Sequence, residues 1–304
     1  MSFLDLYTSS TSSFAGSECK FEDADYVVIG VPLDITSSYR PGSRFAPQRI
    51  REASINIEGF SFRTRKSIGD LKIHDAGDLH VSADVEETLN RLRIVTDEVL
   101  REGKIPVLIG GEHTLTLGSI RSLRGKKIAV ICFDAHLDLR DEYAERRICH
   151  ATVMRRVHEI KNVQRIVMIG TRAVCRDEIA YAEKNGIEIM SSMEINNKSL
   201  RETSLKINSL IDDSDALYLS LDVDVLDPAF APAVQTPEPD GISTYQLLEI
   251  ISRINLKDLV AFDIVEVAPQ YDAGATAAVA AKIIFEVLSR VDQMRNPGWP
   301  KHAP

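Results

Sequence analysis

Apolar runs alternate with amphipathic segments along almost the whole chain. Short runs rich in Val, Ile and Leu are typical of strands that are buried on both faces of a parallel sheet. The expected strands are residues 26–31, 107–109, 128–133, 165–169, 216–221 and 259–265. The sequence therefore predicts a sheet whose strands are mostly buried.

Segments with apolar residues at every third or fourth position are expected to form helices that each bury one face. Residues 84–101 are the clearest case, because Val85, Leu89 and Leu92 recur at this spacing and Asp84 is suited to cap the first turn. Further helices are expected at residues 47–53, 151–160, 177–185, 200–211, 244–253 and 276–290. Strands that alternate with helices indicate βαβ units and hence a mostly parallel, three-layer α/β fold.

Length and composition indicate a globular protein with one domain. The 304 residues show no internal repeat or linker, so we expect a single domain (1–304) with a core at about 26–290 and a peripheral N-terminal segment and Pro-rich tail. A net charge of −9 argues against general nucleic-acid binding. No apolar run is long enough to span a bilayer. Four cysteines without CxxC spacing, and no signal-like segment, predict a cytoplasmic location.

Acidic and histidine side chains collect where three of the apolar runs end. Open α/β sheets place their sites at the carboxyl ends of their strands. Alternate residues of an extended segment point to the same side, so Asp134, His136 and Asp138 should converge if the strand exit stays extended. Asp222 and Asp224 repeat this spacing after another strand. The pattern predicts a cluster of ligands at one edge of the sheet.

The residue types in this cluster favour a metal centre. His113 adds a nitrogen ligand after the pair Gly110-Gly111, whose lack of Cβ atoms lets the backbone pass close to the site. Taken singly, an Asp after a strand is usually a turn former, and a His there is usually packed or capping. Several buried carboxylates would repel one another without cations, which favours the metal. Oxygen-rich sets with one or two imidazoles suit Mn²⁺-like ions, and no cysteine joins the set as structural zinc would favour.

Four segments resemble the signature motifs of the arginase/agmatinase (ureohydrolase) family. They are residues 110–113 (Gly-Gly-Glu-His), 134–138 (Asp-Ala-His-Leu-Asp), 220–228 and 263–269. The resemblance covers about residues 26–290. It implies a three-layer α/β/α sandwich with a central, mostly parallel eight-stranded sheet. It also implies a homo-oligomer (trimer or hexamer), two Mn²⁺ ions per chain, and hydrolysis of a small guanidino substrate to urea and an amine.

The resemblance assigns a role to each site residue. One Mn²⁺ would be held by His113, Asp134, Asp138 and Asp222. The second would be held by Asp134, His136, Asp222 and Asp224, so that Asp134 and Asp222 bridge the pair. Glu112 replaces an Asp that is common in the family and is not a ligand there. Asp227 is expected to be structural.

Two further residues complete the expected mechanism, in which a hydroxide that bridges the metals attacks the guanidinium carbon. Glu266 would accept a two-pronged hydrogen bond from the substrate. His150 would shuttle a proton to the departing amine. The alternatives are a strand-end surface charge for Glu266 and a capping or packed side chain for His150.

Agmatine, cleaved to putrescine and urea, is the expected substrate. Arginases carry Asn, Ser and Thr in the loop before the catalytic His to hold the α-carboxylate, and residues 139–149 contain none of these. Asp141, Glu142 or Glu145 could attract an ammonium group, whereas Arg140, Arg146 or Arg147 would favour a carboxylate. Guanidinobutyrate, guanidinopropionate and arginine remain alternative substrates. A non-catalytic, metal-binding oligomeric protein is a further alternative, although the complete set of site residues argues against it.

Overall fold

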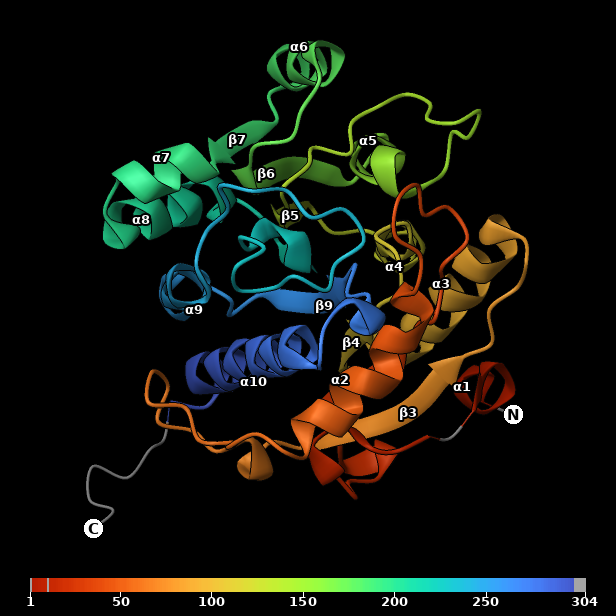
Figure 1. Ribbon diagram of the computed structural model, residues 1–304. Coiled ribbons are helices and arrows are strands. Elements are labelled where there is room, and N and C mark those ends of the chain that lie inside the picture. The colour runs from red at the N-terminus through yellow and green to blue at the C-terminus, as the bar shows by residue number, and fades with distance from the viewer. Residues whose placement is uncertain (1, 10, 298–304) are drawn as a thin grey trace.

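The computed structural model describes residues 2–9 and 11–297, so most of the Pro-rich tail lies outside the described residues. A twisted central sheet runs through the molecule, with helices on both faces (Figure 1). The strand order is β1-β3-β2-β4-β9-β8-β5-β6-β7. The strands are β1 (Thr8–Ser9), β2 (Tyr26–Gly30), β3 (Ile73–Leu79), β4 (Ile105–Ile109), β5 (Ile128–Phe133), β6 (Val163–Thr171), β7 (Glu188–Ser191), β8 (Ala216–Asp222) and β9 (Leu259–Val265).

Within the described residues the sheet has nine strands, one more than the family resemblance implied. The extra strand is β1, which pairs antiparallel with β3 through Thr8 opposite Leu79 and Ser9 opposite Asp78. The other eight strands pair in parallel. This short strand covers an edge of β3 that would otherwise present unpaired backbone groups to solvent.

The helices form two layers, one on each face of the sheet. Figure 1 shows α9 and α10 on one face and α3 and α4 on the other. The first layer contains α2 (Ala46–Ser54), α7 (Ser192–Asn197), α8 (Leu200–Ile211), α9 (Thr244–Arg253) and α10 (Ala275–Arg295). The second contains α1 (Phe3–Tyr7), α3 (Val85–Arg101), α4 (Leu115–Ile120), α5 (Val153–His158) and α6 (Arg176–Asn185). The predicted three-layer α/β fold is therefore confirmed.

Each face of the sheet has its own hydrophobic core. Side chains alternate between the faces along a strand, so Ile131 of β5 packs into the layer of α8, α9 and α10, whereas the neighbouring Cys132 packs into the layer of α3, α4 and α5. Ile131 and Cys132 are both fully buried. All eight parallel strands end at the same edge of the sheet, which places the loops that follow β4, β5, β8 and β9 together.

Among the described residues, none of the helices combines the length and apolar character needed to span a lipid bilayer.

Candidate metal centre

Three parallel strands deliver side chains to one buried cluster. His113 follows β4, and its Nδ1 atom lies 3.2 Å from Asp134 Oδ2, 3.1 Å from Asp138 Oδ2 and 3.5 Å from Asp222 Oδ2. Nδ1 is buried and makes no contact with hydrogen-bond geometry within the described residues. An imidazole nitrogen surrounded by carboxylate oxygens at these distances offers the ligand types that a shared divalent cation would bind.

A second group of ligand atoms adjoins the first. His136 Nδ1 lies 3.0 Å from Asp224 Oδ2 and 3.5 Å from Asp134 Oδ1. Asp134 therefore turns Oδ2 toward His113 and Oδ1 toward His136, as a carboxylate between two ions would. In both aspartates Oδ1 also accepts the backbone N–H two residues on, from His136 at 2.6 Å for Asp134 and from Asp224 at 2.9 Å for Asp222. Asp222 differs in that only its Oδ2 lies near an imidazole, that of His113.

The backbone departs from the extended path expected after β5. Asp138 has a φ of 52°, so the chain turns at this residue. Residues Val223–Val225 form a 3₁₀ turn that directly follows Asp222, the last residue of β8, and contains Asp224. A left-handed backbone at a non-glycine residue costs roughly 1–3 kcal/mol and is kept when its surroundings hold it. Here the carbonyl oxygen of Asp138 accepts a bond of 3.2 Å from Arg155 N–H. The side chains gather because of these turns.

A hydrogen-bond network behind His113 fixes which ring nitrogen carries the proton. Ser220 donates its hydroxyl hydrogen to Asp263 Oδ1 at 2.6 Å, so its oxygen accepts from His113 Nε2–H at 2.9 Å. Asp263 Oδ2 accepts from Thr116 at 2.8 Å and from Tyr218 at 2.5 Å. Such outer partners orient the histidine ligands of metal sites. Burial opposes protonation of the ring, but Asp134 and Asp138 raise the pKa of His113 well above its ordinary value, so a second proton on Nδ1 is favoured in this structure. A cation would replace that proton and bind the Nδ1 lone pair.

The charges of the cluster also suit divalent cations. Burial, together with the charge of Asp134, raises the pKa of Asp138 to about 7, and burial beside Asp224 raises the pKa of Asp222 well above its ordinary value. Burial alone would lower the pKa of His136, but the charges of Asp224 and Asp134 raise it to about 12. These raised pKa values favour protons on His136, Asp138 and Asp222, which offset the buried negative charge when no cation is bound. Bound cations would replace those protons.

Cys132 lies beside the cluster, with its sulfur atom within 4.8 Å of ligand atoms of His113 and Asp134. Its Sγ atom is 3.9 Å from His113 Nε2, the nitrogen on the Ser220 side of the ring, and 4.0 Å from Asp134 Oδ2. Burial raises the pKa of this thiol to about 12. A thiol with this pKa behaves as a small buried hydrophobe at neutral pH.

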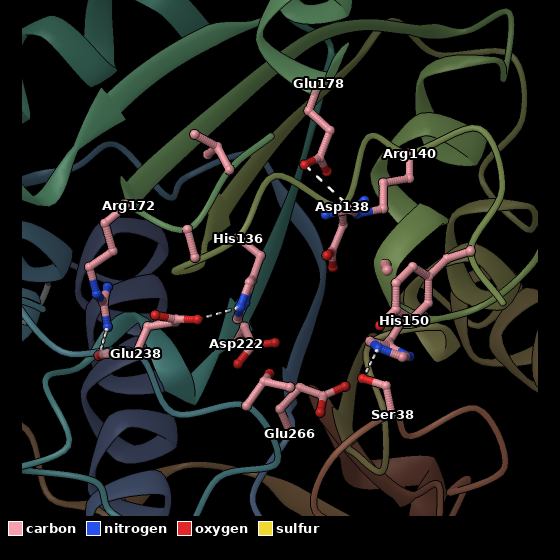
Figure 2. A pocket seen from close by; sticks show the side chains of 15 residues that line it. Ser38, His136, Asp138, Arg140, His150, Arg172, Glu178, Asp222, Glu238 and Glu266 are labelled. Carbon is pink, nitrogen blue, oxygen red and sulfur yellow. Dashed lines mark hydrogen bonds and ion pairs between the residues drawn. The ribbon is translucent and has the colours of Figure 1, made fainter. Parts of the chain in front are cut away.

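A pocket of about 450 Å³ opens above the acidic cluster (Figure 2). Six residues that the sequence singled out line it: His136, Asp138, Arg140, Asp222, His150 and Glu266. Six further polar residues of its wall were missed: Ser38, Tyr143, Arg172, Glu178, Thr236 and Glu238. His113, Asp134 and Asp224 lie beneath this surface and are buried.

Glu266 extends from the residue that follows β9 into the floor of the pocket, next to Asp222 (Figure 2). It is 3% exposed, which rules out a solvated surface charge. One carboxyl oxygen accepts the backbone N–H of His113 at 2.5 Å. Burial raises the pKa of Glu266 well above its ordinary value, although the bond from His113 opposes this shift. A cationic group in the pocket would favour its ionised form.

His150 stands in the pocket wall at the start of the 3₁₀ turn His150–Thr152. Its Nδ1 atom is 3.2 Å from Thr36 Oγ1, and its Nε2 atom is 3.2 Å from Ser38 Oγ (Figure 2). Burial lowers the pKa of this imidazole below its ordinary value. The ring is therefore neutral at pH 7 and can take up a proton.

Among the missed residues, Arg172 has a structural role. Its guanidinium donates to the carbonyl oxygens of Asp224 at 2.7 Å, Glu238 at 2.8 Å and Leu226 at 3.2 Å, and so joins two loops of the pocket. Asp227 also holds this region, because it accepts the backbone N–H groups of residues 229 and 241. Backbone-binding side chains of this kind follow no sequence motif, although Arg172 could be noticed as a charge directly after β6.

The sequence model of the arginase family matches residues 24–289. The chain belongs to the arginase family. An agmatinase of Pyrococcus horikoshii is 35% identical over 291 residues, which cover 93% of this chain and 98% of the relative. A guanidinobutyrase of Pseudomonas aeruginosa is 34% identical over 283 residues, which cover 90% and 88%. The crystal structure of the agmatine ureohydrolase of Thermoplasma volcanium superposes with a TM-score of 0.87 at 35% identity, and covers 94% of this chain and 96% of that one.

Proposed function

We propose that this arginase-family enzyme is a manganese-dependent ureohydrolase that cleaves agmatine to putrescine and urea. The observation that supports the chemistry most strongly is Asp134, whose two carboxyl oxygens face the imidazoles of His113 and His136 separately. Agmatinases among the relatives favour the substrate.

The proposed ligands divide into two sets that share Asp134 and Asp222. The first Mn²⁺ would be held by His113, Asp134, Asp138 and Asp222. The second would be held by Asp134, His136, Asp222 and Asp224. When bound, the two ions would activate a water molecule for attack on the guanidinium carbon. Carboxylate oxygens and imidazole nitrogens are ligands that suit Mn²⁺.

The remaining steps belong to residues of the pocket. Glu266 would accept hydrogen bonds from the guanidinium N–H groups and so orient the carbon above the acidic floor. As water adds to this carbon and the bond to the amine nitrogen breaks, the amine must gain a proton. His150, neutral at pH 7, would take the proton released from the water and deliver it to the amine.

A guanidino acid such as guanidinobutyrate is a second candidate, because Arg140 lines the pocket. Its guanidinium lies over the Tyr143 ring, 5.4 Å from the centroid, and its nearest carboxylate is Glu178 at 4.0 Å. It could therefore bind a substrate carboxylate. Asp141, which we expected as an ammonium partner, is instead held by Arg156 at 2.6 Å.

Glu238 favours the amine substrate. Its side chain is 42% exposed in the pocket wall, and its one ion-pair contact within 4.0 Å among the described residues is to His136 Nε2 at 3.9 Å. A carboxylate with so few partners could bind the terminal ammonium group of agmatine. The choice between the two substrates thus depends on which of Glu238 and Arg140 the distal end of the substrate reaches.

The matched variants Glu238→Gln and Arg140→Gln test this choice, with kcat/KM for agmatine, arginine and guanidinobutyrate measured by urea release on Mn²⁺-loaded protein. We expect agmatine to be the best substrate and Glu238→Gln to lower its kcat/KM by about fivefold, as a partly solvated ion pair of ~1 kcal/mol allows. Arg140→Gln should leave agmatine hydrolysis near the wild-type value. Faster turnover of guanidinobutyrate, lost in Arg140→Gln, would contradict the agmatine assignment. Urea release from none of the three would contradict the ureohydrolase itself.

We also propose that the chain forms a homo-oligomer, a trimer or hexamer, and acts in the cytoplasm. The family resemblance supports the assembly, and the four unpaired cysteines are compatible with a reducing compartment. Sedimentation of the purified protein as a monomer would contradict the proposed oligomer.

A further inference from the structure

A chain of hydrogen bonds joins the metal-ligand segment to the pocket histidine through Thr36. Glu112 precedes His113 in the sequence and accepts the Thr36 hydroxyl at 2.7 Å. The oxygen of this hydroxyl is in turn 3.2 Å from His150 Nδ1 and 3.2 Å from the backbone nitrogen of His150. Thr36 is buried, and none of the sequence motifs includes it.

The Glu112 carboxyl group can only accept in this network. Its Oε2 atom accepts the backbone N–H groups of Ile35 and Thr36, both at 2.7 Å. Its Oε1 atom accepts the hydroxyl groups of Thr36 at 2.7 Å and Thr114 at 2.8 Å. Four donors therefore occupy the two oxygens, and the hydroxyl hydrogen of Thr36 is committed to Glu112.

This commitment determines the direction of the next bond. A hydroxyl group has one hydrogen and two lone pairs. Since the hydrogen of Thr36 points to Glu112, its two lone pairs remain for the backbone N–H of His150 and for the ring atom Nδ1. Nδ1 must then carry the proton, which leaves the lone pair of the neutral ring on Nε2. Ser38 Oγ, 3.2 Å from Nε2, is placed to donate to that lone pair.

We propose that Thr36 is a positioning residue that holds His150 as the Nδ1–H tautomer, with the basic Nε2 atom directed into the pocket. This inference rests on the proposed function, in which His150 takes up a proton. The Tyr143 ring packs edge-on against the imidazole at a centroid distance of 5.9 Å and limits its rotation. Orientation of a catalytic imidazole by a fixed acceptor at the opposite nitrogen is a recurring device in enzymes.

The segment that carries Thr36 is itself firmly held. Asp34 accepts the Ser37 hydroxyl at 2.6 Å, the Gly42 backbone N–H at 2.7 Å and Arg44 Nε at 2.9 Å. Ser37 thus supplies a matched control, because its hydroxyl group stabilises the same segment and makes no contact with His150.

The test compares Thr36→Val, Thr36→Ser and Ser37→Ala in the Mn²⁺-loaded full-length enzyme. Valine keeps the shape of threonine and removes the acceptor, whereas serine restores it. We measure kcat and KM for agmatine, guanidinobutyrate and arginine, bound manganese, and the melting temperature. Crystal structures of the two Thr36 variants report the orientation of the His150 ring.

Thr36→Val should lower kcat by about tenfold or more, a part of the ~10²–10⁴-fold that an acid–base group contributes, with KM and bound manganese little changed. Thr36→Ser should recover most of kcat, Ser37→Ala should resemble the wild type, and the ring should turn only in Thr36→Val. A wild-type kcat in Thr36→Val, or a loss that Thr36→Ser and Ser37→Ala share, would overturn the proposal. If the wild-type enzyme releases no urea from any of these substrates, the proposed function fails instead; the ring orientation in Thr36→Val and Thr36→Ser then still decides whether Thr36 positions His150.

Discussion

Removal of the Ser220 hydroxyl group should weaken metal binding far more than it disturbs the fold. The hydroxyl accepts the Nε2 proton of His113 at 2.9 Å and donates to Asp263 at 2.6 Å. In Ser220→Ala the metal-free protein avoids an unpaired donor, because His113 can release its Nε2 proton and keep the proton on Nδ1, which faces carboxylates at 3.1–3.5 Å. Metal binding requires Nδ1 to give up that proton, which leaves the buried Nε2–H with only the weak acceptor Cys132 Sγ at 3.9 Å. The cost therefore falls on binding.

The size of the effect follows from this orphaned group. A buried donor without a partner costs about 1–3 kcal/mol. Since about 1.4 kcal/mol corresponds to a tenfold change in affinity, the dissociation constant of the ion at His113 should rise roughly 5- to 150-fold. Loss of an outer partner of a metal-binding histidine typically costs about 10–100-fold, which agrees with this range.

The assay is calorimetric titration of Mn²⁺ into metal-free protein, with the melting temperature measured in parallel. Thr116→Val is the matched control, because the Thr116 hydroxyl donates to the other oxygen of Asp263 at 2.8 Å, and the one bond from Thr116 to His113 joins backbone atoms that the substitution keeps. The control should lose stability and keep its Mn²⁺ affinity. Unchanged affinity in Ser220→Ala would refute the reasoning on the tautomer of His113. An equal loss of affinity in both variants would assign the effect to Asp263.

Two further predictions concern the proposed ligands and the proton shuttle. Asp134→Ala should lose both ions, because the two oxygens of Asp134 face different imidazoles, whereas Asp224→Ala should keep the ion at His113. Elemental analysis of bound manganese tests this prediction. Full occupancy in Asp134→Ala would exclude Asp134 as a bridging ligand. His150→Ala should lower kcat by ~10²–10⁴-fold with bound manganese retained, and an unchanged kcat would remove His150 from the mechanism. Because burial lowers the pKa of His150 below 6.5, the wild-type kcat should show an acidic limb below that pH, at saturating Mn²⁺, that the variant lacks.

The parallel core of the fold could be predicted from sequence because its elements carry their own signal. Helices α8 and α9 begin and end at the predicted residues, since their buried positions recur at helical spacing. The strand β5 is likewise observed at its predicted bounds, as an apolar run with both faces buried. The geometry of a parallel sheet then brings the residues after β4, β5 and β8 to one edge, which is why the acidic cluster could be anticipated.

Elements whose polar residues are compensated by distant partners were missed. β3 contains Asp75 and Asp78, which argue against a buried strand when the segment is considered alone. In the structure the buried Arg51 of α2 binds both carboxylates, at 2.8 and 2.5 Å, and neutralises them. This compensation spans more than twenty residues of sequence and has no local signature. Helix α4 was missed for another reason: all of its residues are buried, so it shows no amphipathic period.

The same distinction explains why the arginase-family hydrolase could be recognised from the sequence, whereas agmatine as its substrate stays a prediction. The floor of the pocket comes from strand ends, whose positions the sheet determines. The walls that would meet the distal end of a substrate carry Arg140 and Glu238 on loops, where no periodic pattern constrains the path of the chain. Relatives at 35% and 34% identity bear the names agmatinase and guanidinobutyrase, so identity over the whole chain is too coarse to separate these substrates. Arg140 and Glu238, two loop side chains of opposite charge in one pocket, would decide between agmatine and guanidinobutyrate as the substrate.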